Sequence, residues 1–145
     1  MMIKTSENLP MGRLLANLGR THGMRIDQLM EQIGLYRGQA ILLLTLAEQN
    51  GLTHGEIAER LCISPAAASK VIKRMEGLGY VQRTTDPTDE RVSRVYLLDG
   101  GRAKLDDIHA VFHAINARML KDFSPEEHAA LHRMLLRMTH NLQNS

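Results

Sequence analysis

Apolar side chains recur every three or four residues along the first part of the chain. They stand at positions 15, 18, 26, 29 and 33, with His22 in the same row, and this spacing predicts a long helix that ends at Gly34. Glycines at positions 12, 19 and 23 predict that this helix bends. Residues 36–49 are apolar on most sides, which predicts a second helix that is buried.

Short polar motifs mark the beginnings of three more helices. The sequence "THGE" at 53–56 is a capping box, in which Thr53 and the glutamate three residues later each accept a hydrogen bond from the other's backbone N–H. "SPAA" at 64–67 puts a capping Ser64 before Pro65, which occupies the first helical position, where an N–H is not needed. "SPEE" at 124–127 combines both signals. Helices are therefore expected to begin near residues 54, 65 and 125, and the first of them to end near residue 61.

The pattern changes between residues 79 and 99. The runs "YVQRTT" and "VSRVYLL" are rich in strand-forming residues, and "DPTDE" between them is typical of a turn, so this segment predicts an antiparallel hairpin. Beyond it, apolar residues step by three and four from Leu105 to Phe123 and again from Leu131 to Leu142. These two stretches predict two long helices.

The order of these elements is a helix-turn-helix followed by a β-hairpin, or wing. The expected fold is mainly α with a small β-hairpin wing. A winged helix-turn-helix core at 35–99 would lie between an N-terminal dimerisation helix at 1–34 and C-terminal dimerisation helices at 100–145. The apolar stripes of the outer helices are too long for the core to cover, which favours a homodimer.

The helix predicted at 65–78 has two different faces. The face expected to point inward carries Ala68, Val71, Ile72, Met75 and Leu78. The opposite side carries small side chains, which allow a helix to approach the floor of the DNA major groove and to meet thymine methyl groups. On that side Ser69 and Lys70 are placed for base edges, and Lys73 and Arg74 for phosphates. The free N–H groups at the start of the helix also suit a phosphate oxygen.

Composition narrows the function classes. The chain has 145 residues, a formal net charge of +2 and a single cysteine, so any basic character is local and no internal disulfide forms. The first residues lack the apolar run of a signal peptide, and the longest apolar run, "AILLLTLA", is too short to span a bilayer, which favours the cytoplasm. Neither a nucleophile–base pair nor a glycine-rich phosphate loop is found, so neither an enzymatic activity nor a cofactor is expected.

Residues 52–101, beginning "LTHGEIAERLCISPAAASKVIKRMEGLGY", resemble the winged helix-turn-helix core of the MarR family of bacterial transcriptional regulators. The wing "DPTDERVSRVYL" carries Asp89 and Arg91, which match the family's Asp-x-Arg. The resemblance implies a homodimer that binds a pseudo-palindromic operator in double-stranded DNA, often as a repressor, and that a small anionic or phenolic effector releases. Together with the helix faces, it assigns DNA contacts to Thr53, Ser64, Pro65, Ala66, Ala67, Ser69, Lys70, Lys73, Arg74, Asp89 and Arg91.

The sequence departs from the family pattern at three positions. Cys62 stands in the turn where the family commonly has Gly, and we expect a small buried residue there rather than a redox sensor. Glu90 replaces a frequent basic residue and lowers the positive potential of the wing. Leu98 replaces a capping Thr, so Asp99 is expected to cap the next helix. Within the wing, the Asp89 carboxylate is expected to orient Arg91 or Arg94.

Two further sites remain as alternatives. The pair His109 and His113, spaced by four residues, can chelate a divalent metal, as can the pair at 128 and 132. His22 is a plausible third ligand, but a fourth is missing, and solvated histidines on a helix flank are the simpler interpretation. His22, Tyr36 and Arg37 also lie near the junction of the first two helices, close to where family members hold effectors. Arg37 there can pair with an acidic ligand, with a DNA phosphate or with a carboxylate of the protein.

Two functional alternatives follow from these observations. One is a metal-responsive repressor that uses the histidines. The other is a winged-helix module that binds proteins and has lost DNA binding, against which the retained Lys70, Lys73, Arg74 and Arg91 argue.

Overall fold

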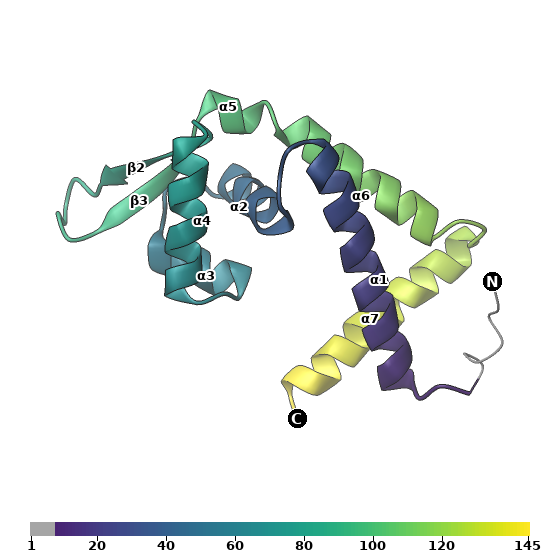
Figure 1. The fold of residues 1–145 in the computed structure, drawn as a ribbon. Coiled ribbons are helices and arrows are strands. Elements are labelled where there is room, and N and C mark those ends of the chain that lie inside the picture. Colours follow the sequence, from purple (N-terminus) through teal and green to yellow (C-terminus); the bar gives the residue numbers. More distant parts are fainter. Residues whose placement is uncertain (1–7) are drawn as a thin grey trace. The chain divides into compact units, whose positions relative to one another are not determined.

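The computed structural model describes residues 8–145, in which helices predominate over a small sheet (Figure 1). Residues 1–7 of the expected N-terminal dimerisation segment lie outside this range. The elements in chain order are α1 (Met11–Gln32), α2 (Arg37–Glu48), β1 (Leu52–Thr53), α3 (His54–Leu61), α4 (Pro65–Gly77), β2 (Val81–Thr85), β3 (Ser93–Leu97), α5 (Asp99–Arg102), α6 (Leu105–Met119) and α7 (Pro125–Gln143).

The described residues fall into two compact units, divided between Phe112 and His113 within α6. The first unit contains everything from α1 through the wing to the first turns of α6. The second contains the rest of α6 together with α7. Within the described range, no helix combines the length and the apolar character that crossing a membrane would require.

The capping motifs set the helix starts where the sequence predicts them. The Thr53 hydroxyl accepts a hydrogen bond from the Glu56 backbone N–H at 3.2 Å, and the Glu56 carboxylate accepts one from the Thr53 N–H at 3.1 Å. At α4, the Ser64 hydroxyl accepts from the backbone N–H of Ala67 at 3.1 Å, and Pro65 is the first helical residue. Ser124 and Glu127 repeat the reciprocal arrangement at the start of α7. These three predicted starts are confirmed.

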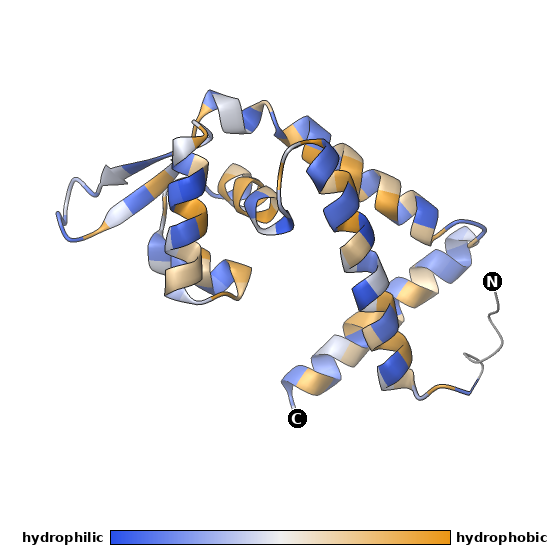
Figure 2. Ribbon diagram, in the orientation of Figure 1, coloured by the Kyte–Doolittle hydropathy of each residue, from blue (hydrophilic) through white to orange (hydrophobic). Residues whose placement is uncertain are grey.

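The core of the first unit lies where α2, α3 and α4 meet the sheet. Its largest fully buried side chains include Met30, Leu42, Leu43, Leu46, Leu52, Ile57, Ile72, Met75, Val81 and Val95. Figure 2 shows the corresponding hydrophobic segments along α2 and α4. On α4 the buried stripe is narrower than predicted, because Val71 is half-buried and Leu78 is 49% exposed. Both residues lie at the edge of the stripe that Ala68, Ile72 and Met75 define.

The hairpin is part of a three-stranded antiparallel sheet in the order β1–β3–β2. Val81 pairs with Leu97 and Thr85 with Ser93, as the predicted hairpin requires. The two-residue strand β1, which the sequence did not predict, pairs Leu52 with Val95. The loop before it is bound to β3 by side chain and backbone. The Asn50 Oδ1 accepts a hydrogen bond from the Leu97 N–H at 2.8 Å, and the Gly51 N–H donates to the Val95 carbonyl at 3.0 Å.

The segment after the wing differs from the prediction in two respects. Leu98 is the cap of the short helix α5, and Asp99 is already its first helical residue, so the expected cap by Asp99 is wrong. The side chain of Leu98 carries no hydrogen-bond acceptor, so α5 begins without a side-chain cap. The helix predicted from Leu105 to Phe123 ends at Met119, because Asp122 takes a left-handed φ of 65° before the cap of α7 begins.

Candidate nucleic-acid interface

The outward face of α4 is open, small and basic. Pro65, Ala66, Ser69, Lys70, Lys73 and Arg74 are exposed, and Ala67 is half-buried. Ala68, Ile72 and Met75 on the opposite side are fully buried, so packing fixes which face points outward. Within residues 8–145, Lys70 and Lys73 form no ion pair, and their charges are therefore free for a ligand. This is the face that the sequence predicts for a recognition helix.

The turn between α3 and α4 is made by Cys62. Its backbone is left-handed, with φ 54° and ψ 44°, and its N–H bonds back to the Glu59 carbonyl at 3.2 Å. The side chain is exposed, so the prediction of a buried residue is wrong. The reason lies in the turn itself, because a left-handed residue just after the last turn of a helix projects its side chain away from the packed stripe. The conformation also accounts for the Gly that the family pattern has at this position.

The wing is held by Asp86. Its carboxylate accepts hydrogen bonds from the N–H and hydroxyl of Thr88, at 2.8 and 2.6 Å, and pairs with the Arg94 guanidinium at 2.6 Å. These bonds to Thr88 and Arg94 hold the pKa of Asp86 well below its usual range. Arg94 also donates to the Gly51 carbonyl at 2.9 Å, so one ion pair joins the wing tip to the loop before β1.

Asp89 has a different role from the one predicted. Its Oδ1 accepts a hydrogen bond from the backbone N–H of Arg91 at 3.0 Å, and it forms no ion pair with Arg91 or Arg94 within the described residues. Asp89 therefore stabilises the backbone turn, and the carboxylate that orients Arg94 is that of Asp86. The Arg91 side chain is exposed and has no carboxylate partner anywhere in residues 8–145.

The wing and the start of α3 share a shallow hollow. It is lined by Thr53, His54, Gly55, Arg91, Val92 and Ser93. Two predicted contact residues that lie far apart in the sequence, Thr53 and Arg91, thus come to one place. Because the hollow opens at a helix N-terminus and beside a free guanidinium, its electrostatics suit an anion such as a phosphate oxygen.

A second ion pair joins the wing to α4. The Arg83 guanidinium binds Glu76 at 2.8 Å, and the Arg83 N–H donates to the same carboxylate at 3.1 Å. These hydrogen bonds lower the pKa of Glu76. His54 lies near the pair, and burial, with Arg83 as the second cause, lowers the pKa of His54, which favours its neutral form. Its Nε2 is buried and has no hydrogen-bond partner among the described residues.

Comparisons with known proteins agree with this architecture. A family model described as "MarR family" matches residues 35–93. The HTH-type transcriptional repressor MdtR of Bacillus subtilis is 34% identical over 98 residues, which cover 68% of this chain and 63% of that protein. The HTH-type transcriptional repressor Rv2887 of Mycobacterium tuberculosis is 26% identical over 130 residues, which cover 90% of this chain and 94% of the relative. The chain belongs to the MarR family of transcriptional regulators.

The fold of this MarR-family regulator is that of solved relatives. The crystal structure of an S. aureus MepR–DNA complex matches it with a TM-score of 0.82 at 21% identity, over 92% of this chain and 99% of that one. At this identity the likeness establishes the winged-helix fold.

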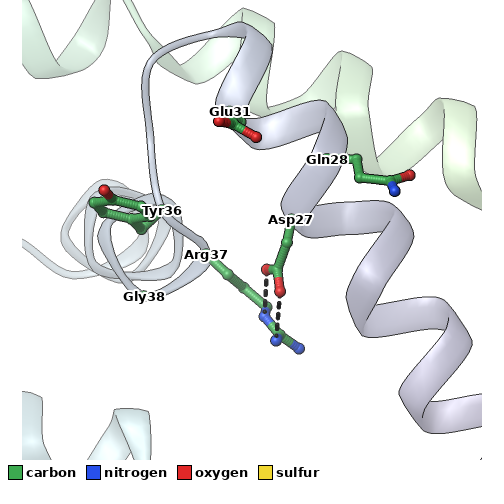
Figure 3. A pocket seen from close by; sticks show the side chains of 6 residues that line it. All are labelled: Asp27, Gln28, Glu31, Tyr36, Arg37 and Gly38. Carbon is green, nitrogen blue, oxygen red and sulfur yellow. Dashed lines mark hydrogen bonds and ion pairs between the residues drawn. The ribbon is translucent and has the colours of Figure 1, made fainter.

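The candidate effector site of this MarR-family chain is a pocket where α1 meets α2. It has a volume of about 560 Å³ and is lined by Asp27, Gln28, Glu31, Tyr36, Arg37 and Gly38 (Figure 3). Tyr36 and Arg37 belong to it as the sequence predicts, whereas His22, half-buried on α1, does not line it. The acidic residues of α1 were missed, because only the folded junction shows which face of α1 meets Arg37.

Arg37 is already paired with a carboxylate of the protein. Its guanidinium makes two contacts with the Asp27 carboxylate, at 3.0 and 3.1 Å, which Figure 3 shows as dashed lines. It also packs against Gly23, where a Cβ would lie only 2.8 Å from the Arg37 Nη1. The sequence leaves an acidic ligand, a DNA phosphate and a carboxylate of the protein as possible partners of Arg37. In the structure its partner is the carboxylate of Asp27.

Tyr36 connects this pocket to α4. The Arg74 guanidinium lies over the Tyr36 ring, 5.6 Å from its centroid, in a cation–π contact. Sequence reasoning placed the two residues in separate sites, and no local signal joins them, because they lie on different helices.

The histidines do not come together into a metal centre. Within residues 8–145, no group of three or more His, Cys, Asp or Glu side chains is arranged to hold a metal ion. His109 and His113 are exposed on α6, and His128 and His132 line a shallow hollow on α7 with Pro125, Ala129 and Arg133. The expected contribution of His22 to a site with His109 and His113 is thus not found.

Proposed function

We propose that this MarR-family regulator is a cytoplasmic homodimer that represses transcription by binding a pseudo-palindromic operator, and that a small-molecule effector releases it. The observation that carries the proposal is the outward face of α4, where small side chains are flanked by the cations of Lys70 and Lys73. Among residues 8–145 neither these lysines nor Arg91 of the wing forms an ion pair. In this arrangement α4 enters the major groove and Arg91 approaches the adjacent minor groove.

Each part of the interface has a distinct task in this proposal. Lys70 and Ser69 lie near the middle of the exposed face and reach base edges, while Lys73 and Arg74 lie one turn later and meet phosphates. Thr53 and the N–H groups at the starts of α3 and α4 bind phosphate oxygens at the helix N-termini. Phosphate contacts fix the register on the duplex, and the base contacts select the sequence.

Dimerisation is supported by apolar surface that the chain leaves uncovered. On α1, Met11, Leu14, Leu15 and Leu18 are exposed at helical spacing, with Leu18 at 51%. In the unit that begins at His113, only Ile115 is buried, and Leu135, Leu136 and Leu142 are exposed. Figure 2 shows hydrophobic segments along α1, α6 and α7. Several exposed apolar side chains at helical spacing mark an interaction site, and residues 1–34 and 100–145 are the segments we assign to it.

The test is a DNA-binding assay on the chain's own upstream region by fluorescence anisotropy. The wild type is expected to bind it specifically, and Ala67→Glu is expected to abolish that binding, since the carboxylate would meet the groove floor and the phosphates. The matched control is Ala47→Glu, which adds the same group at an exposed position of α2. Circular dichroism checks that both variants fold.

The outcomes discriminate between the candidate functions. Normal operator binding by Ala67→Glu would show that the assigned face of α4 is wrong. A folded, dimeric wild type without affinity for its upstream DNA would instead favour the protein-interaction module.

A further inference from the structure

The Tyr36 ring has two neighbours, a pocket beside it and the Arg74 guanidinium above it. We propose that the pocket at the α1–α2 junction binds a small aromatic cation, and that this ligand displaces Arg74 from the Tyr36 ring and so weakens operator binding. The proposal rests on the proposed function for its second half, because it treats Arg74 as a phosphate contact. Its first half, the ligand class, rests on the pocket alone.

The charges around the pocket select a cation. Asp27 and Arg37 neutralise each other through two contacts, and the packing of Arg37 against Gly23 keeps the guanidinium in that place. Glu31, which also lines the pocket, forms no ion pair within the described residues. Among the residues that line the pocket, Glu31 is therefore the one charged side chain without a counter-charge in the described part of the chain. Its carboxylate attracts a cation and repels an anion.

The Tyr36 ring beside the pocket also favours a cation. Tyr36 is 66% exposed, and the face of its ring already attracts the guanidinium of Arg74. A ring face carries negative potential and binds cations and other flat rings. A ligand with both a ring and a positive charge would satisfy Tyr36 and Glu31 together, and the pocket volume of about 560 Å³ admits a molecule of several rings.

Occupancy of the pocket is coupled to α4 through this ring. The contact with the Tyr36 ring orders the Arg74 guanidinium in the free protein, before a phosphate arrives. A cation against the Tyr36 ring repels the guanidinium and weakens its contact with that ring. Each protomer then loses one preorganised phosphate contact, and operator affinity falls.

The experiment uses two probes of matched shape and opposite charge, tetraphenylphosphonium and tetraphenylborate. Calorimetric titration of the full-length wild type without DNA is expected to show binding of the phosphonium and at least about tenfold weaker binding of the borate. Glu31→Gln is expected to weaken phosphonium binding. The matched control Glu48→Gln, which neutralises an exposed glutamate at the end of α2, is expected to leave it unchanged.

The coupling is measured as operator affinity with and without saturating phosphonium. A decrease of about 5- to 30-fold is expected in the wild type, since two cation–ring contacts are lost per dimer. In Arg74→Ala, which binds operator more weakly from the start, the phosphonium is expected to bind the protein but to cause no further decrease. Tyr36→Leu is expected to lose the phosphonium effect, which also excludes an effect of the probe on DNA.

The results separate the two halves of the proposal. Equal binding of both probes, or binding that Glu31→Gln leaves unchanged, would overturn the ligand class whatever the DNA result. Phosphonium binding that leaves operator affinity unchanged, or that weakens it equally in Arg74→Ala, would overturn the coupling. Absence of operator binding by the unliganded wild type would overturn the proposed function and the coupling with it, while the calorimetric result on the ligand class would stand.

Discussion

Cys62 takes a backbone conformation that disfavours every residue except Gly and, to a lesser degree, Asn and Asp. With φ 54° and ψ 44°, its Cβ lies close to the following carbonyl oxygen, which costs roughly 1–2 kcal/mol for an L-residue with a side chain. The turn keeps this conformation because α3 and α4 are packed on either side of it. The strain is therefore local and can be removed without a change in the fold.

Replacing Cys62 with Gly should accordingly stabilise the protein. Part of the relief is offset by the greater freedom of Gly in the unfolded chain, so a gain of up to about 1 kcal/mol is expected. Cys62→Val should lose about 1 kcal/mol or more, because a β-branched residue fits this region worst. Urea denaturation of the three proteins measures both changes. An unaltered operator affinity in Cys62→Gly would show that the thiol takes no part in DNA binding.

At the scale of the elements, the wing depends on one carboxylate. Asp86 accepts hydrogen bonds from Thr88 and from Arg94, and its folded pKa is lowered from an ordinary value of 3.8. A lowered folded pKa means that the ionised carboxylate stabilises the fold at pH values above about 4, and that this contribution is lost as the pH falls through the folded value. Asp86→Asn should therefore be less stable than the wild type near neutral pH, and the difference should shrink in acid.

Denaturation curves from about pH 7 down to about pH 2 measure this difference, because the contribution declines between the ordinary and the lowered pKa of Asp86. The control is Glu90→Gln, which removes a carboxylate from the same wing that makes no hydrogen bond or ion pair within the described residues. A constant difference between Asp86→Asn and the wild type over the whole range would show that ionisation of Asp86 does not stabilise the wing.

The wing and α4 should also differ in how they bind DNA. Arg91→Ala removes a charge that reads groove width and phosphate, so affinity should fall for all sequences, and the salt slope of the dimer should decrease by roughly two. Lys70→Ala should instead relax discrimination within the half-site. Affinity measured against salt concentration, for operator and unrelated DNA, distinguishes the two. If Arg91→Ala retains the wild-type slope, the wing does not engage DNA, and the charge of Glu90 would be the first cause to examine.

The elements that the sequence predicted are those whose signals are local. Thr53, Ser64 and Ser124 each satisfy backbone groups within three residues, so their helix starts can be predicted without knowledge of the rest of the fold. Strand β1 could not be predicted, because its two residues are strand only through their pairing with Val95 and Arg94, some forty residues later. The same applies to the site. The face of α4 follows from periodicity, whereas the contacts of Arg94 with Asp86 and of Arg74 with Tyr36 depend on how distant segments meet.

For the whole molecule, the uncovered apolar surface predicts that dimerisation is required for operator binding. Two recognition helices about 34–36 Å apart would meet successive major grooves, and a single protomer would hold only one half-site. Leu18→Glu should weaken the dimer by roughly 100-fold or more, because two side chains each lose about 1.5–3 kcal/mol of burial. Operator affinity should fall with it.

Sedimentation velocity over a range of protein concentrations tests this expectation. Leu78→Glu is the control, since Leu78 is also exposed, at 49%, but lies at the end of α4 outside the segments assigned to dimerisation. A wild type that is a stable folded monomer at micromolar concentration would contradict the dimer. A Leu18→Glu variant that dimerises like the wild type would place the interface elsewhere.

The loop before β1 also gives the molecule a form of chemical durability. Asn50 and Gly51 make the dipeptide that most readily deamidates: the glycine backbone nitrogen attacks the side-chain carbonyl carbon, the side-chain nitrogen leaves as ammonia, and water opens the resulting succinimide to aspartate or isoaspartate. Here the Gly51 N–H is bound to the Val95 carbonyl, and the Asn50 side-chain oxygen is bound to the Leu97 N–H. Both reacting groups are thereby engaged in hydrogen bonds with the central strand. Ageing at this bond can proceed only when β1 and β3 separate, so the accumulation of aspartate and isoaspartate at residue 50 would record how often the sheet opens during the lifetime of the protein.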